Sequence, residues 1–207
     1  MGNKCKLYPD DGDAFQGAMT DENVLIFPDK SVYRGEIVNN RPHGKGVLTR
    51  PNGAVHDGTW DNGYASGYGK AVYPNSHSYE GYFVKGKRDG EGKYVTDEFS
   101  YIGEWHQGKM NGRGLIKYND GRQYEGDFKE DTFNGTGVYV YKSGQKFKGS
   151  FINGKRHGRG DITFKDGSIY QGEWDHGQEI NTAAYTSKLG NSVIGRWNGE
   201  SFVPKYE

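Results

Sequence analysis

Hydrophobic and polar residues alternate in short runs along most of this chain. In residues 101–105, Tyr101 and Trp105 alternate with Ile102 and Glu104, and this period of two predicts a β-strand. A second alternating run follows a few residues later, after a stretch that contains several glycines. The two runs together predict a pair of short strands.

The same pair of runs returns along the chain as an internal repeat. Thirty-one of the 34 glycines occupy five positions of the repeat, and all four tryptophans occupy one position, four residues after the start of a copy. Consecutive copies start 22 or 23 residues apart, which defines a 23-residue unit. The copies start at Tyr33, His56, Tyr79, Tyr101, Tyr124, Phe147, Tyr170 and Val193, and a shortened copy starts at Phe15.

Each copy is expected to form a two-stranded hairpin. In the copy that starts at Tyr101, residues 107–112 are predicted to form a glycine-bearing loop and residues 119–121 a tight turn. Gly103 and Gly114 fall inside the predicted strands, where they leave room for aromatic rings to lie over bare backbone. The predicted fold class is therefore all-β: an elongated, single-layer antiparallel β-meander of about seven to eight hairpin repeats, seven of which span about 70 Å.

The repeat also carries a family resemblance. The pattern Tyr-x-Gly-x-Trp-x-x-Gly-x-x-x-Gly-x-Gly, which is clearest in residues 101–123, 124–146 and 147–169, resembles the MORN repeat (membrane occupation and recognition nexus). The resemblance covers residues 15–199. It implies an elongated single-layer sheet of the kind that is often curved into a groove.

The copies at the two ends depart from this pattern. The copy at 170 has Asn181 and Ala183 in place of two glycines, and the copy at 15 lacks five residues of the loop. The ends of a repeat protein are usually atypical because they must stop the stacking. We therefore divide the chain into an N-terminal segment (1–14), a degenerate capping repeat (15–32), seven tandem repeats (33–192), and a partial repeat with a tail (193–207).

Composition limits the classes of function. The 207 residues carry 27 basic and 27 acidic side chains, so the chain lacks the positive field of a typical nucleic-acid binder. Its 16 Tyr, 10 Phe and 4 Trp supply burial area that the few aliphatic residues do not. The single cysteine excludes an internal disulfide. No apolar run reaches about 18 residues and no signal-peptide pattern opens the sequence, so we expect a reducing compartment.

No arrangement of residues in the sequence suggests catalysis, a cofactor or a metal ion. Catalysis needs a nucleophile, a base and a stabilising group that converge in one pocket, and the repeats leave no length for a catalytic domain. The histidines are dispersed, and no Cys–His cluster has zinc spacing. They are His43, His56, His77, His106, His157 and His176. We expect a protein that is not an enzyme, with no cofactor, no metal and no nucleic-acid partner.

The aromatic positions carry the main functional hypothesis. A single-layer sheet has no second layer over its face, so these side chains either pack on one another as the core or stay partly open as a groove. Open aromatic surface with a polar rim is typical of protein-binding sites. The candidate groove residues are Tyr79, Phe83, Tyr101, Trp105, Tyr118, Tyr124, Phe128 and Tyr141. The expected partner is a helix, an extended peptide or neighbouring subunits of a large assembly, and a homodimer is a further alternative.

Basic residues recur in the predicted long loops, which lie along one side of the sheet. They are Arg41, Lys45, Lys87, Arg88, Lys109, Arg113, Lys155, Arg156 and Arg159. Aligned charges of this kind are able to bind phosphoinositide headgroups, which makes peripheral membrane contact an alternative function. Charged edges also keep sheets from associating with their own copies, so an ordinary solvated surface is the competing interpretation.

Two cellular settings follow from different features of the sequence. The N-terminus offers Gly2 for myristoylation and Cys5 for palmitoylation, although Lys6 replaces the Ser or Thr of the myristoylation motif. Acylation favours an adaptor between membrane and cytoskeleton. The resemblance to MORN-repeat proteins of radial-spoke heads implies instead a structural subunit of the ciliary axoneme. We expect a non-enzymatic scaffold in the cytoplasm, at the cytoskeleton or cilium or at the membrane periphery.

Overall fold

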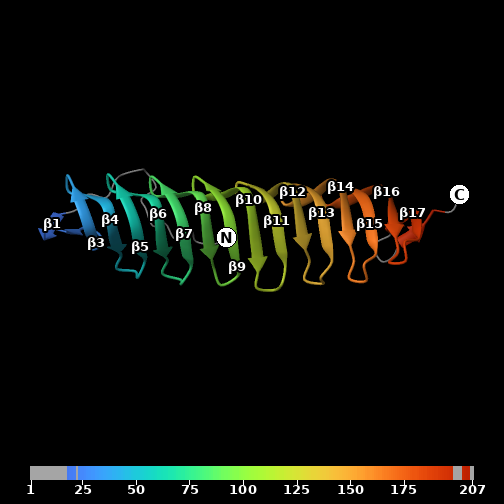
Figure 1. Ribbon diagram of the computed structural model, residues 1–207, viewed down its shortest axis with the longest axis horizontal. Coiled ribbons are helices and arrows are strands. Elements are labelled where there is room, and N and C mark those ends of the chain that lie inside the picture. The colour runs from blue at the N-terminus through green and yellow to red at the C-terminus, as the bar shows by residue number, and fades with distance from the viewer. Residues whose placement is uncertain (1–17, 22, 198–201, 206–207) are drawn as a thin grey trace. The chain divides into compact units, whose positions relative to one another are not determined.

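The computed structural model describes residues 18–21, 23–197 and 202–205. The chain divides into two compact units, unit 1 (residues 1–109) and unit 2 (residues 110–207). Every described element is a β-strand, and most of the strands are labelled in Figure 1. The proposed acylation residues Gly2 and Cys5, the segment 1–14 and the first residues of the capping repeat lie outside the described residues.

In unit 1 each strand pairs antiparallel with the next one along the chain, from the first strand to the ninth. The strands are β1 (Ala18–Asp21), β2 (Val24–Ile26), β3 (Val32–Val38), β4 (Arg41–Thr49), β5 (Val55–Asp61), β6 (Tyr64–Val72), β7 (Ser78–Val84), β8 (Lys87–Val95) and β9 (Phe99–His106). Strand β10 (Lys109–Tyr118) begins at the last residue of this unit.

Unit 2 repeats the same topology. The strands after β10 are β11 (Gln123–Lys129), β12 (Thr132–Val140), β13 (Lys146–Ile152), β14 (Lys155–Thr163), β15 (Ile169–Asp175), β16 (Gln178–Thr186), β17 (Ser192–Trp197) and β18 (Phe202–Pro204). From β10 to β18 each strand again pairs antiparallel with its successor. The predicted all-β antiparallel meander of hairpin repeats is therefore confirmed within each unit.

The turns differ from the prediction in one respect. The turn inside a copy contains two residues, such as Asn62 and Gly63 between β5 and β6, whose φ angles are 49° and 88°. Positive φ at both central residues is the type I′ geometry, which matches the twist of the two strands. The six-residue loop predicted at this place is wrong, because the residues after the turn continue as a strand. A bulge between Gly58 and Trp60 takes up the difference in register.

The core consists of rings on one face of the sheet, which we call the aromatic face. In the copies that start at His56 through Tyr170, the first position and the position four residues later are buried on this face, as is the first position of the copy at Tyr33, and each of these residues is 5% exposed or less. These residues are Tyr33, His56, Trp60, Tyr79, Phe83, Tyr101, Trp105, Tyr124, Phe128, Phe147, Phe151, Tyr170 and Trp174. The rings meet edge to face within a copy and between successive copies, as the 5.0 Å Tyr79–Phe83 and 5.4 Å Tyr79–Trp105 centroid distances show.

The polar atoms of these rings are satisfied by the backbone. The hydroxyl of Tyr33 donates to the carbonyl of His43 at 2.9 Å, and Nε1 of Trp60 donates to the carbonyl of Gly46 at 3.0 Å. Both acceptors lie on the neighbouring strand β4. The two rings therefore reach over the backbone of β4, where Gly46 has no side chain. The expectation that strand glycines make room for rings is confirmed, since a Cβ at Gly46 would collide with the ring of Tyr33.

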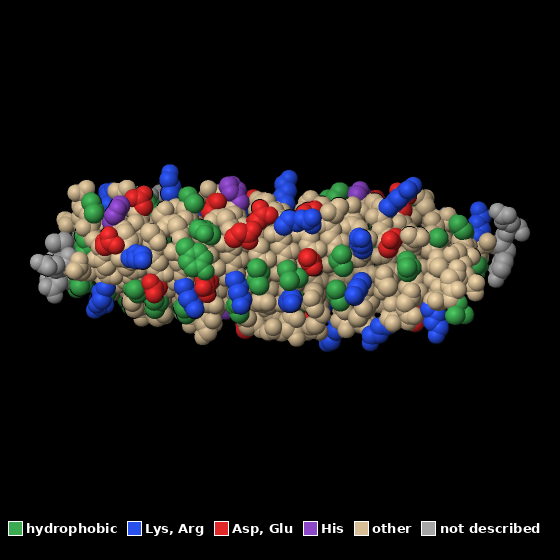
Figure 2. Space-filling model, viewed as in Figure 1, with side chains coloured by type: hydrophobic (Ala, Val, Ile, Leu, Met, Phe, Trp, Pro, Cys, Tyr) green, Lys and Arg blue, Asp and Glu red, His purple; other side chains and the backbone are tan. Residues whose placement is uncertain are grey.

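The opposite face, which we call the polar face, is exposed and carries charges of both signs. Glu80, Glu104 and Glu125 are exposed there, in strands β7, β9 and β11. Figure 2 shows Lys and Arg side chains interspersed with Asp and Glu, with hydrophobic side chains scattered singly or in small groups among them. Mixed charges on an open sheet reduce its tendency to associate through exposed backbone.

One core residue makes stability depend on pH. His56 occupies the position that tyrosine fills in most copies, its side chain is fully buried, and burial lowers its pKa to about 4. The unfolded chain binds the proton at about pH 6.5, so His56 adds stability above that pH and the contribution is lost as the pH falls towards 4. We expect the free energy of unfolding to drop by about 3 kcal/mol more between pH 7 and pH 4 than in a His56→Tyr variant.

Urea unfolding at a series of pH values measures this difference. The His56→Tyr variant is the matched control because tyrosine restores the residue of the neighbouring copies at Tyr33 and Tyr79. Parallel pH profiles for the two proteins would show that the buried imidazole does not govern the acid sensitivity.

Candidate partner-binding surface

Six of the eight residues predicted to line an aromatic groove are buried. Tyr79, Phe83, Tyr101, Trp105, Tyr124 and Phe128 each expose 4% of their surface or less. The structure therefore assigns them to the core, which was the competing interpretation of the aromatic positions. The physical reason is that rings of one copy cover the rings of the next, so a single layer still buries its aromatic positions.

Tyr118 and Tyr141, the other two predicted groove residues, are half-buried, and they lie among aromatic side chains that the sequence analysis missed. Tyr139 meets Tyr141 edge to face at 4.8 Å between ring centroids, and Phe133 lies 6.1 Å from Tyr139. We call six half-buried aromatic residues of the tandem copies in unit 2 the aromatic ledge: Tyr118, Phe133, Tyr139, Tyr141, Phe164 and Tyr185. All of them lie on the second strand of a copy or at its end.

The aromatic ledge lies on the same face as the core. Tyr139 is the cross-strand partner of the buried Tyr124, and the ring of Phe133 stacks on that of Tyr124 at 3.9 Å. A signal for these residues was present in the sequence, because most of them fall 15 or 17 residues after the start of a copy. The strand alternation puts those positions on the aromatic face.

Arginines accompany the aromatic ledge. The guanidinium carbon of Arg122 lies 4.5 Å from the ring centre of Tyr118, and its Nε pairs with Asp120 at 2.7 Å. Burial raises the pKa of the Tyr118 hydroxyl, and it also raises the pKa of Tyr141, against the opposing effect of the Arg156 guanidinium. Both phenols therefore stay neutral hydrogen-bonding groups near pH 7. The surface combines flat rings, hydroxyls and guanidinium groups.

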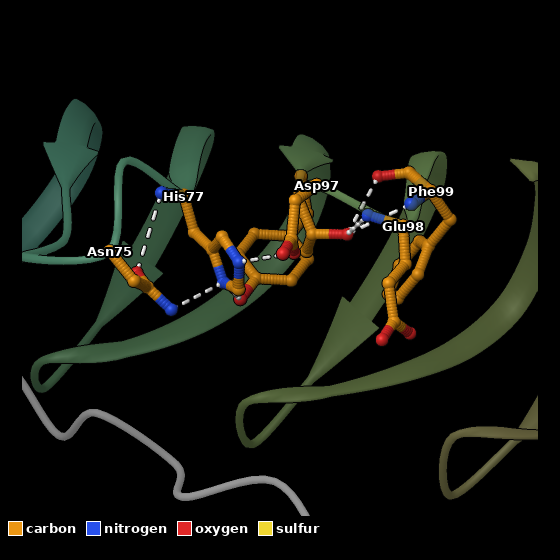
Figure 3. Close-up of polar contacts among 7 residues, drawn as sticks. Asn75, His77, Asp97, Glu98 and Phe99 are labelled. Atoms are coloured by element: carbon orange, nitrogen blue, oxygen red, sulfur yellow. Dashed lines mark hydrogen bonds and ion pairs between the residues drawn. The ribbon is translucent and has the colours of Figure 1, made fainter. Parts of the chain in front are cut away.

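Unit 1 carries a related group of contacts around the half-buried Tyr94, and Figure 3 labels three of its members, Asn75, His77 and Asp97. Nδ1 of His77 lies 2.9 Å from the Asn75 amide nitrogen and 3.3 Å from the Tyr94 hydroxyl, and Nε2 of His77 lies 2.9 Å from Asp97. The His77 contact lowers the pKa of the Asp97 carboxyl. Tyr73 meets Tyr94 edge to face at 6.2 Å. These bonds hold the Tyr94 ring in one orientation on the aromatic face.

The nine residues of the predicted basic edge occupy three positions of the repeat. The guanidinium carbon of Arg88 lies 4.0 Å from the ring centre of Trp105 on the aromatic face, and Arg156 packs in the same way in its copy. Arg113 lies on the polar face, 3.5 Å from Asp127. Lys45 and Arg159 share the repeat position of Arg113. The remaining four each begin the second strand of a copy, and they are Arg41, Lys87, Lys109 and Lys155. The basic residues of each unit are therefore divided among three repeat positions rather than gathered at one.

In one place the structure brings together histidines that the sequence analysis expected to be dispersed. Gly158 pairs with Trp174, which sets His157 beside Asp175 on the neighbouring strand. The ring centroids of His157 and His176 lie 5.2 Å apart. This contact depends on the register between two copies, which spacing along the sequence does not display.

The described residues define a class, that of proteins with stacked β-hairpin repeats and an aromatic core on one face of the sheet in each unit. The family model described as MORN repeat matches residues 33–55, 56–78, 79–96, 101–121, 124–146 and 147–169. The chain belongs to the MORN-repeat family. A search of curated protein sequences gave no match.

Two solved structures resemble the chain. One is the SAS-4 (dCPAP) TCP domain of Drosophila melanogaster in complex with a proline-rich motif of Ana2 (dSTIL), at 14% identity and a TM-score of 0.48, with 73% of this chain and 83% of that chain covered. The other is the TCP10 domain of Danio rerio CPAP in complex with a peptide of Danio rerio STIL, at 13% identity and a TM-score of 0.48, with 84% and 73% covered. Among the described residues, no helix is long and apolar enough to cross a membrane.

Proposed function

We propose that this MORN-repeat chain is a non-enzymatic scaffold that binds protein partners through its aromatic face. The observation that carries the proposal is the aromatic ledge of unit 2, whose six aromatic side chains are half-buried on one face. They are held by core rings beneath them, as Tyr124 holds Phe133, and keep part of their own surface open. The binding surface of the sequence analysis thus moves from the buried positions to Tyr118, Tyr141 and their neighbours.

The chemistry of the aromatic ledge favours protein over other ligands. Tyrosine and arginine are the residue types that contribute most to protein interfaces, because each offers a large apolar surface together with a hydrogen-bonding group. Tyr118 with Arg122, and Tyr141 with Arg156, provide both in adjacent pairs. Rings that are already packed also lose little side-chain entropy when a partner binds.

The proposed partner is a helix or an extended peptide, or a neighbouring subunit of a large assembly. The proposed setting is a cytoskeletal or membrane–cytoskeleton site, with the ciliary axoneme as the alternative. A phosphoinositide site has weaker support, since the nine basic residues predicted for it are divided among three repeat positions and two of them, Arg88 and Arg156, pack against core rings.

A displayed peptide library tests the proposal. The immobilised 207-residue chain is expected to enrich peptides whose binding is weakened about 30-fold or more by Tyr139→Ala combined with Tyr141→Ala, a loss of about 2 kcal/mol that is usual for central interface residues. The matched control is Tyr82→Ala, because Tyr82 is a half-exposed tyrosine on the polar face. Affinities are measured by calorimetry, and circular dichroism confirms that each variant is folded.

Three results would contradict the proposal. The first is that the wild-type protein enriches no peptide, and the second is that the double variant binds as tightly as the wild type. The third is that Tyr82→Ala removes binding while the double variant keeps it, which would place the site on the polar face.

A further inference from the structure

Three polar side chains of unit 2 converge where strands β14 and β15 end in a turn. His157 lies on β14, Asp175 is the last residue of β15, and His176 is the first residue of the turn. Nδ1 of His157 and Nδ1 of His176 lie 3.2 Å and 2.6 Å from the same atom, Oδ1 of Asp175. All three ligand atoms lie within 4.8 Å of one another. Two imidazole nitrogens therefore face one carboxylate oxygen.

The buried nitrogen of this group needs an electrophilic partner. Nδ1 of His157 is shielded from solvent, and within the described part of the chain it makes no hydrogen bond of acceptable geometry, although Asp175 is near. A shielded ring nitrogen without a hydrogen bond is unfavourable. A cation placed between the two rings and the carboxylate would accept the lone pair of this nitrogen.

The arrangement follows from the repeat itself. His43 lies 3.5 Å from Asp61 in unit 1, at the same two repeat positions as His157 and Asp175. The residue after Asp61 is Asn62, whose φ of 49° matches the 48° of His176. The backbone of the turn is therefore alike in the two places. The copy that starts at Tyr170 differs in placing a second imidazole at the turn position.

We propose that His157, Asp175 and His176 bind a divalent transition-metal ion of borderline hardness, of which Zn²⁺ is the representative. Two imidazole nitrogens and one carboxylate oxygen suit Zn²⁺, Ni²⁺ or Cu²⁺, whereas Mg²⁺ and Ca²⁺ prefer oxygen ligands alone. Asp175 and His176 are largely exposed, so water or a group from a partner completes the coordination. The bound ion ties β14 to the turn between β15 and β16.

Calorimetry with Zn²⁺ on the untagged full chain tests the site. The wild type is expected to bind one equivalent, and His176→Asn is expected to weaken binding about tenfold or more, as the loss of a metal-site group does. Asparagine already occupies this turn position at Asn62 and Asn153 with positive φ, so the variant keeps the turn. Absence of binding by the wild type, equal binding by the variant, or equally tight binding of Mg²⁺ would overturn the proposal.

A gain of function provides an independent test. Asn62→His places a second imidazole beside His43 and Asp61, at the repeat position of His176. The variant is expected to bind a second equivalent of Zn²⁺, and the resonances of His43 should shift in histidine NMR spectra during the titration. If the variant folds and still binds a single equivalent, the three repeat positions are not sufficient for a site and the geometric argument fails.

Discussion

Replacing Trp105 with alanine is expected to lower the free energy of unfolding by about 3–5 kcal/mol, the usual cost of removing a large buried aromatic side chain. Trp105 is 4% exposed, and its ring meets those of Tyr79 and Tyr101 edge to face at 5.4 Å and 5.2 Å. Its Nε1 donates to the carbonyl of Gly92 at 3.3 Å, and the guanidinium of Arg88 covers the ring. Alanine leaves a cavity and removes all four contacts.

Equilibrium urea unfolding, followed by far-ultraviolet circular dichroism, measures the effect. The control is Ile102→Ala in the same strand, because Ile102 lies on the opposite face and is 52% exposed. Its substitution is expected to change stability by about 0.5 kcal/mol or less. A loss for Trp105→Ala no larger than that of the control would mean that the tryptophan serves as open binding surface rather than as core. Trp105→Phe should lose less, since Phe83 and Phe128 fill this position in other copies.

Periodicity alone predicted the meander, and the reason is physical. A hairpin that recurs every 23 residues with the same glycines and rings has one way to stack, strand beside strand, so the order and direction of the strands follow. The length of the turn between the two strands of a copy could not be predicted from the periodicity. Gly154 has a φ of 77° in the turn and Gly158 has a φ of 66° in the next strand, at its bulge. Both positions favour glycine because their φ angles are positive. A glycine in the sequence therefore does not distinguish a turn from a bulge.

The exposed aromatic surface was harder to predict because exposure depends on packing between copies. Tyr79 and Trp105 belong to different copies, and each covers the other. In a single hairpin considered alone, both rings would be exposed. The sequence therefore predicted them to line a groove. Tyr118 and Tyr141 were predicted together with the buried rings, and Tyr139 was not predicted at all, because only the stacked sheet separates half-buried from buried aromatics.

Replacing Gly137 with alanine is expected to destabilise unit 2 by about 3 kcal/mol, at the upper end of the usual cost of overpacking a core. Gly137 lies on β12 beneath the ring of Tyr124, and a Cβ there would come within 2.6 Å of three atoms of that side chain. The ring is held by Phe128, Phe133 and Phe151, at centroid distances of 5.2, 3.9 and 5.1 Å. It cannot move aside without opening the core of two copies.

The chain contains its own comparison at the equivalent position of the copy that starts at Tyr170, where Ala183 replaces the glycine. The ring of Tyr170 lies 6.3 Å from that of Trp174, whereas Tyr124 lies 5.2 Å from Phe128. The hydroxyl of Tyr170 bonds the side chain of Glu179. A methyl group on this strand is thus accompanied by a displaced ring, and an end copy tolerates the displacement.

A double-mutant cycle separates this steric cause from a general effect of losing glycine. In a Tyr124→Leu background the leucine leaves space above β12, so Gly137→Ala should cost at least about 1 kcal/mol less than in the wild type. Urea unfolding of the four proteins gives the coupling. A coupling near zero would mean that the backbone of β12, rather than the tyrosine ring, requires glycine. The positive coupling expected here would make the Tyr–Gly pairing the element that sets how closely the two strands of one copy of the MORN repeat pack.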